Sequence, residues 1–228
     1  MSGFFTTSIG RKVAMALSAL FLMIFLLQHF AINILSVFSP GLFNEVSHFM
    51  GTNPLVQFAL QPVLIFAVVF HFIMGFYLEI KNKKARQVSY ASNNGSANSS
   101  WVSRNMIWSG AVILAFLGLH FYDFWAPEIN IKYFKGDMSG LLNPADVESG
   151  FRYHEELVHK FVDPIRVGMY VLSFVFLALH LMHGFASAFQ SIGASTVRRK
   201  RLQTIAKIYA YALPIGFIFI ALYHHFNH

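Results

Sequence analysis

The sequence predicts an all-α integral membrane protein with five transmembrane helices, and two observations carry this prediction. Of the 228 residues, 56% are hydrophobic and only 12% are charged, which is far from the composition of a soluble domain. Apolar runs of about 20 residues, the length that crosses a bilayer, occur five times. We place these segments at residues 13–37, 56–80, 105–126, 166–190 and 205–226.

The cores of these five segments contain no Lys, Arg, Asp or Glu, and the nearest acids, Glu79 and Asp123, come close to segment ends. The first segment is too long for the apolar part of a signal peptide, and no A-x-A-like cleavage site follows it. We therefore expect it to remain in the mature chain as a transmembrane helix.

Basic residues gather on one side of the expected membrane, whereas nearly all of the acids lie on the other side. The basic side has Arg11, Lys12, Lys81, Lys83, Lys84, Arg86, Arg104, Arg198, Arg199, Lys200, Arg201 and Lys207. By the positive-inside rule, the N-terminus is cytoplasmic and the C-terminus is outside. The pI of 9.7 therefore reports membrane topology, and we expect no nucleic-acid partner.

Residues 1–228 are expected to form a single membrane domain, because no internal soluble segment is long enough to fold alone. The polar, low-complexity stretch 87–103 predicts a flexible cytoplasmic loop. The longest connection is an outer loop over residues 127–164, in which the part from Asp146 to Phe161 could form a short surface helix. No internal sequence repeat is expected.

One histidine in each of the first four segments is the most informative feature of the chain: His29, His71, His120 and His180. Imidazole is costly to bury in hydrocarbon, so intramembrane histidines indicate function. The chain has no cysteine, which excludes thiolate-ligated clusters and C-x-x-C-H haem attachment. The economical cofactor is haem b, with its iron held between two imidazoles. The other histidines outside these segments are expected to be solvated: His48, His154, His159, His224, His225 and His228.

The depths of the four histidines predict how they pair. His29 and His120 come late in segments that run outward, roughly 9–12 Å below the outer edge at about 1.5 Å per residue. His71 and His180 come late in segments that run inward, roughly 15 Å from the cytoplasmic edge. The first four helices are thus expected to surround two stacked haems, and the fifth to pack against them without holding iron.

Glycines support the inner pair, and a second histidine contests one of its members. His71 and His180 each have a glycine four residues later, Gly75 and Gly184, and this spacing places the glycine on the same helix face. The missing side chain would leave room for a flat macrocycle. His183 is an alternative to His180 because it lies only three residues away, although the glycine spacing favours His180.

The motifs Gln28-His29, Phe70-His71-Phe-Ile-Met-Gly75-Phe-Tyr77, Leu119-His120 and His180-Leu-Met-His-Gly184, with Gly193 beyond, carry a family resemblance. Over essentially its whole length, the chain resembles the two-haem, single-subunit cytochrome b anchor of succinate dehydrogenase and fumarate reductase. The resemblance implies that histidines of the first and third helices pair, as do those of the second and fourth. The chain departs from some members of that family because it has no glutamate within the stretch 176–180 and because its outer loop is longer.

The resemblance also implies partners and a location. A flavoprotein subunit and an iron–sulfur subunit would dock on the cytoplasmic face in the bacterial inner membrane, and electrons would pass to a membrane quinone, which we expect to be menaquinone. The chain itself has no motif for oxidising succinate. For the quinone, Asn44 and Glu45, with His48, offer polar partners near the outer side, and Glu45 is the first candidate; its alternative role is that of a solvated loop acid.

Two other functions remain open. The cytochrome b subunit of a hydrogenase or formate dehydrogenase also uses membrane histidines, usually distributed differently among its helices. A transporter with histidine relays would be expected to carry intramembrane carboxylates or broken helices, and the five apolar cores show neither.

Overall fold

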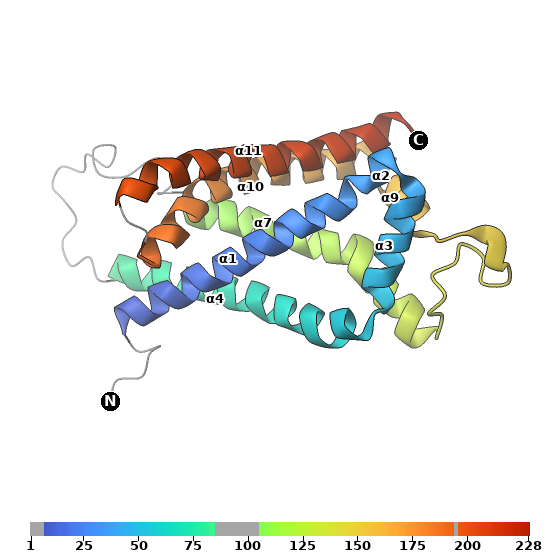
Figure 1. The fold of residues 1–228 in the computed structure, drawn as a ribbon, viewed down its shortest axis with the longest axis horizontal. Helices are drawn as coiled ribbons and strands as arrows, with labels where there is room; N and C mark the ends of the chain where they lie inside the picture. Colours follow the sequence, from blue (N-terminus) through green and yellow to red (C-terminus); the bar gives the residue numbers. More distant parts are fainter. Residues whose placement is uncertain (1–6, 85–104, 194–195) are drawn as a thin grey trace.

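The computed structural model describes residues 7–84, 105–193 and 196–228. All of the long elements in these ranges are helices (Figure 1). Among the described residues, five helices are long and apolar enough to cross a membrane, as the sequence predicted. They are Ser8–Phe38, Val56–Lys84, Met106–Phe134, Pro164–Ser191 and Arg201–Phe226. The predicted cytoplasmic loop 87–103 lies outside the described residues.

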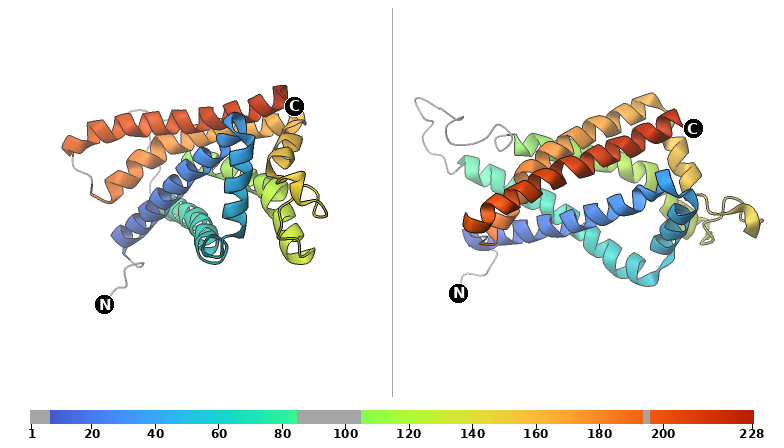
Figure 2. Two further views of the ribbon diagram at one scale, coloured as in Figure 1. Left: turned by 45° about the vertical axis from the view of Figure 1, so that its right-hand side comes forward. Right: turned by 45° about the horizontal axis from the view of Figure 1, so that its top comes forward.

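The long helices run alternately up and down one bundle (Figures 1 and 2). Their regular α-helical parts are α1 (Ser8–Asn33), α4 (Gln61–Lys84), α7 (Met106–His120), α10 (Pro164–Ser191) and α11 (Thr196–Phe226). Helix α1 begins at one end, which we call the basic end, and the C-terminus lies at the other, which we call the loop end. By charge, the basic end is the expected cytoplasmic side.

The packed core lies mainly around α10 and α11, whereas α4 is loosely held. Two clusters of buried residues connect α10 and α11 with α1 and the loop end. On α4, in contrast, Ala67 is the one buried residue. Small residues let helices approach closely in membranes, and Gly216 shows this, because an added Cβ there would lie 2.6 Å from Cζ of Phe30. α11 therefore closes one side of the bundle, while α4 contributes little to the packed core.

The third helix is longer than the predicted segment 105–126, and its extension shortens the predicted outer loop. After α7 the chain winds as a π-helix, η3 (Phe121–Trp125), and continues through α8 (Ala126–Ile129) and a second π-helical turn, η4 (Asn130–Phe134). Pro127 directly follows the π-helical turn η3, where the regular i to i−4 hydrogen-bond pattern is already interrupted, and the helix continues past it.

The connection between the first and second long helices is also helical, which the sequence did not predict. It consists of α2 (Leu35–Phe38) and α3 (Pro40–Thr52), followed by the π-helical turn η2 (Val56–Leu60) that leads into α4. Pro40 begins α3, and Phe43 anchors it in the core with only 5% of its surface exposed.

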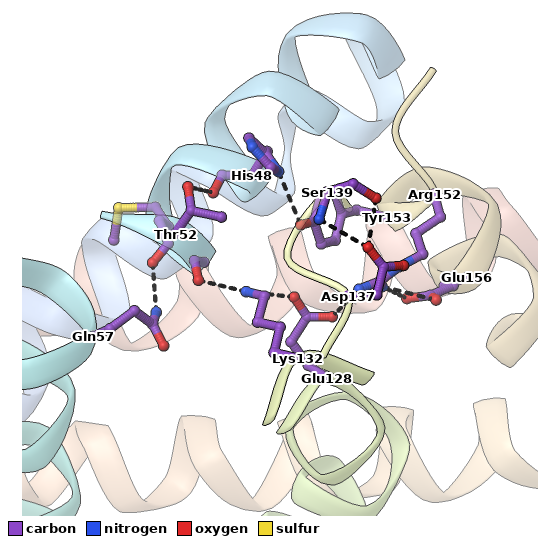
Figure 3. A network of polar contacts seen from close by, with 12 residues as sticks. His48, Thr52, Gln57, Glu128, Lys132, Asp137, Ser139, Arg152, Tyr153 and Glu156 are labelled. Atoms are coloured by element: carbon purple, nitrogen blue, oxygen red, sulfur yellow. Dashed lines mark hydrogen bonds and ion pairs between the residues drawn. The ribbon is translucent and has the colours of Figure 1, made fainter. Parts of the chain in front are cut away.

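At the loop end, a network of charged side chains joins the extended third helix to the segment before the fourth (Figure 3). Glu128 lies at its centre, 2.6 Å from Nζ of Lys132 and 2.6 Å from a guanidinium nitrogen of Arg152. Lys132 also donates to the carbonyl of Gly51 in α3, and Arg152 pairs with Glu156 at 2.9 Å. Lys132 and Arg152 are buried, so the pairing offsets the cost of removing their charges from water.

The expected surface helix near the loop end exists in part. It comprises the short 3-10 turn η5 (Val147–Ser149) and α9 (Tyr153–Phe161). Leu157 and Phe161 of α9 are buried in the core, so α9 caps the bundle. The amide of Asn44 ties it to α3, because Nδ2 donates to the carbonyl of Phe151 at 2.7 Å and Oδ1 accepts from the backbone N–H of His154 at 2.8 Å.

Candidate functional site: two histidine pairs

The bundle brings the four predicted histidines together as two pairs. The rings of His71 on α4 and His180 on α10 have centroids 6.2 Å apart and planes at 67°. The rings of His29 on α1 and His120 on α7 have centroids 5.7 Å apart and planes at 89°. We call the first two the inner pair and the second two the outer pair, after the sides of the membrane expected for the two ends of the bundle.

The spacing within the inner pair fits two imidazoles that bind one metal ion from opposite sides. With metal–nitrogen bonds of about 2.0–2.1 Å and about 1.2 Å from each nitrogen to its ring centroid, the two centroids are separated by about 6.4 Å. The inner pair, at 6.2 Å, is close to this value, and the outer pair, at 5.7 Å, would open by roughly 0.7 Å to reach it. The angle between the ring planes is free, because each ring can rotate about its own bond to the metal.

Polar contacts surround the inner pair. Oγ of Ser18 on α1 lies 3.2 Å from Nδ1 of His71, and Oγ of Ser109 on α7 lies 3.2 Å from Nδ1 of His180. In both histidines the hydroxyl contacts Nδ1, and no hydrogen bond to Nε2 is found within the described part of the chain. Nε2 is then the nitrogen that each ring can offer to a metal.

Aromatic rings surround the outer pair instead. Phe25 stacks on His29 with centroids 5.4 Å apart, and Phe116 stacks on His120 with centroids 5.8 Å apart. Phe217 of α11 lies 5.9 Å from the ring of His29. Nδ1 of His120 is buried and has no hydrogen-bond partner among the described residues. A buried polar atom left in this state is rare in folded proteins and points to a site that a further group completes.

The glycines four residues after His71 and His180 each face the end of a methionine side chain. A Cβ added at Gly75 would approach only the terminal methyl of Met15, at 3.6 Å. At Gly184 the corresponding neighbour is the terminal methyl of Met106, also at 3.6 Å. Both neighbours are the ends of flexible side chains. The four paired histidines are themselves only half-buried, so the bundle does not fill the space around them with protein atoms.

The structure distinguishes the two candidates on α10. His180 is the one that lies beside His71 and contacts Ser109. His183 is half-buried, and within the described ranges it makes no hydrogen bond or ring contact. The geometry therefore favours His180 as the partner of His71.

The two residues predicted to bind quinone lie on α3, and the structure brings neither into contact with the outer pair. Asn44 uses both ends of its amide to hold α9. Glu45 is exposed. His48 stacks on Phe151 with centroids 4.2 Å apart and lies 3.3 Å from the hydroxyl of Tyr153. These contacts give Asn44 and His48 a structural role and leave Glu45 as the accessible polar group.

Sequence reasoning missed a buried acid beside the outer pair. Asp123 is only 2% exposed, and the helix continues beyond it to Phe134. Its Oδ2 accepts from the hydroxyl of Tyr170 at 2.9 Å, and its Oδ1 lies 3.4 Å from Nε of Arg166. The ring of Tyr170 in turn lies 6.4 Å from that of His120. The π-helical turn around Asp123 was a further feature that hydropathy could not reveal, and such turns often mark functional sites.

The expectation that His224 is solvated was wrong. Its side chain is buried at 3% exposure, and Nε2 lies 2.9 Å from Oγ of Ser36. The ring of His154 lies 5.4 Å from that of His224. The fold caused this difference, since α9 and α2 cover the end of α11.

Within the described residues, no group of three or more His, Asp or Glu side chains is placed to hold a metal ion. Comparisons of the chain with protein-family models, with curated proteins and with solved structures gave no match.

Proposed function

We propose that this chain is the dihaem cytochrome b membrane anchor of a succinate:quinone oxidoreductase. The observation that supports the proposal is the pairing of four intramembrane histidines, each from a different helix, at separations of 5.7 and 6.2 Å. His29 and His120 would hold one haem b, and His71 and His180 would hold the other. A haem with two imidazole ligands accepts and donates single electrons.

The residues around the pairs fit such groups. Beside Gly75 and Gly184 only the flexible ends of Met15 and Met106 come near, and the contacts at Nδ1 leave Nε2 available. Around the outer pair, the stacked phenylalanines form an apolar setting for the second haem, and the Nδ1 atom of His120 lacks a hydrogen-bond partner among the described residues. The two pairs follow one another along the bundle, so electrons could cross from one side of the membrane toward the other.

The proposed partners follow from the family resemblance and from charge. A flavoprotein and an iron–sulfur subunit would dock at the basic end, where Lys81 and Lys84 are exposed and Lys83 pairs with Glu79 at 3.1 Å. Quinone, which we expect to be menaquinone, would react near the outer pair, with Glu45 as the accessible polar group. The setting would be the bacterial inner membrane.

The decisive test is the haem content of the purified chain. We expect b-type bands in a reduced-minus-oxidised spectrum and about two haems per polypeptide by pyridine haemochrome assay. A preparation made with sufficient haem supply that folds as a helical membrane protein but contains no haem would overturn the proposal. Copurification with succinate-oxidising subunits would separate it from the hydrogenase and formate dehydrogenase alternatives.

A further inference from the structure

The helices that hold the two pairs carry an internal repeat. Aligned with an offset of 91 positions (120 − 29), residues 15–30 and 106–121 share six identical residues. These are Met15/Met106, Ser18/Ser109, Phe25/Phe116, Leu26/Leu117, His29/His120 and Phe30/Phe121. With an offset of 109 (180 − 71), the second and fourth helices share His71/His180, Gly75/Gly184 and Phe76/Phe185. The expectation of no repeat was therefore wrong. The repeat is hard to recognise in the sequence because the two offsets differ and the identical residues are few.

The repeat recurs in three dimensions as matching contacts. Ser18 of α1 contacts Nδ1 of His71 on α4, and Ser109 of α7 contacts Nδ1 of His180 on α10, at 3.2 Å in both cases. The methionine three residues before each serine is also placed alike, because a Cβ added at Gly75 would lie 3.6 Å from the terminal methyl of Met15, and one added at Gly184 would lie 3.6 Å from that of Met106. Two independent copies of one arrangement indicate that the serine–histidine contact is a built feature of the site.

The proton of each serine hydroxyl is already committed. Ser18 donates to the carbonyl of Met15 at 2.8 Å, and Ser109 donates to that of Met106 at 2.9 Å. A hydroxyl has one proton, so toward the histidine each serine can only accept a hydrogen bond. The imidazole must therefore carry its proton on Nδ1, and its lone pair lies on Nε2.

We propose that Ser18 and Ser109 are positioning residues that fix the tautomer and ring orientation of His71 and His180, so that Nε2 faces the inner haem iron. This inference rests on the proposed function. A hydrogen bond donated by the far nitrogen of a ligating histidine orients the ring and makes it a more basic ligand. A more basic ligand stabilises oxidised iron relative to reduced iron, so removing the bond raises the midpoint potential of the inner haem.

The test uses the full complex in membranes, with Ser18→Ala, Ser109→Ala and the double variant. Redox titration followed in the b-type bands should show the inner haem titrating at a higher potential, by up to about 59 mV for a tenfold change in relative affinity. Haem affinity of the inner site should fall by about 10-fold or more in the double variant. The outer haem should keep its potential in all three variants.

Ser173 provides a matched control. It is a buried serine of α10 that donates to the carbonyl of Met169 at 2.7 Å and contacts no paired histidine among the described residues. Ser173→Ala should leave both potentials unchanged. Ser18→Thr keeps the hydroxyl and should restore the wild-type potential, which also covers the case that Ser18→Ala fails to assemble.

The outcomes separate this inference from the proposed function. If the wild-type chain holds two haems but Ser18→Ala and Ser109→Ala behave like Ser173→Ala, the positioning role is wrong and the cytochrome proposal stands. The positioning role is equally wrong if Ser18→Thr assembles and its inner potential moves as far as that of Ser18→Ala. If the wild-type chain holds no haem, the proposed function itself falls.

Discussion

The inner and outer pairs are built from the same repeat, yet their surroundings differ in kind. Each inner histidine contacts a serine hydroxyl from the preceding membrane-crossing helix. Each outer histidine instead stacks with the phenylalanine four residues before it in its own helix. The inner rings are thus held by hydrogen bonds, and the outer rings are held by stacking.

This difference shows how one helix–helix unit can provide two environments. Helices α1 and α7 each carry both a serine and a histidine of the outer pair, 11 positions apart (29 − 18), so each contributes a histidine at one depth and a hydrogen-bond acceptor at the other. We expect the two proposed haems to differ in potential, because hydrogen bonding at the far nitrogen of a ligand is one of the factors that set it.

The strongest test of the comparison removes one ligand from each pair. His71→Ala should abolish the inner haem signal and His120→Ala the outer one, because a lone imidazole cannot supply both axial ligands. Difference spectra with redox titration would show which component is lost. Loss of the same component in both variants would contradict the pairing.

Replacement of the two histidines on α10 is a narrower test. His180→Ala should remove the inner haem, whereas His183→Ala should leave its spectrum in place, because only His180 lies beside His71. The opposite result would reassign the ligand to His183. If neither change affects the spectrum, the fourth helix does not supply an inner ligand.

A buried acid makes the outer side sensitive to a change that the inner side should not notice. Asp123→Asn removes the charge that faces Arg166, and we expect a loss of about 2 kcal/mol in stability, reduced from the value for a fully buried pair because Arg166 is partly exposed. Tyr170→Phe keeps the ion pair and should cost about 1 kcal/mol. Thermal unfolding in detergent gives the loss, and the haem spectra should change at the outer component only. Equal disturbance of both components would argue against a local role.

The smallest expected effect is a pH dependence of the loop end. Burial, assisted by the nearby charge of Lys132, lowers the pKa of His48 below its usual value of 6.5. As pH falls below 6.5, the unfolded chain therefore binds a proton before the folded chain does, and stability declines until the lower folded pKa is reached. The same residue causes no stability change with pH well above 6.5.

This effect can be isolated by comparing variants. The melting temperature of the wild-type chain, measured from pH 7.5 to 5, should fall more steeply than that of His48→Gln. Glu156 shifts in the opposite sense, because burial raises its pKa, but it contributes equally to both proteins. Parallel curves would show that His48 does not couple to folding.

The sequence alone determined the five membrane-crossing helices and the depth of each histidine. Uncharged runs of sufficient length have few alternatives in a bilayer, and rise per residue converts position into depth. For the same reason, the pairing of the first helix with the third, and of the second with the fourth, could be predicted before any fold was known. The glycines beside His71 and His180 were also recognisable, because i and i+4 share a helix face.

Only the tertiary structure decided which side chains meet those histidines. The choice of His180 over His183, the acceptor role of Ser18 and the burial of Asp123 all depend on how neighbouring helices rotate and where they end. Hydropathy treats every face of a membrane helix alike, since lipid and protein interior are similarly apolar. Local pattern therefore set the depth of each group, whereas packing between helices set its partners.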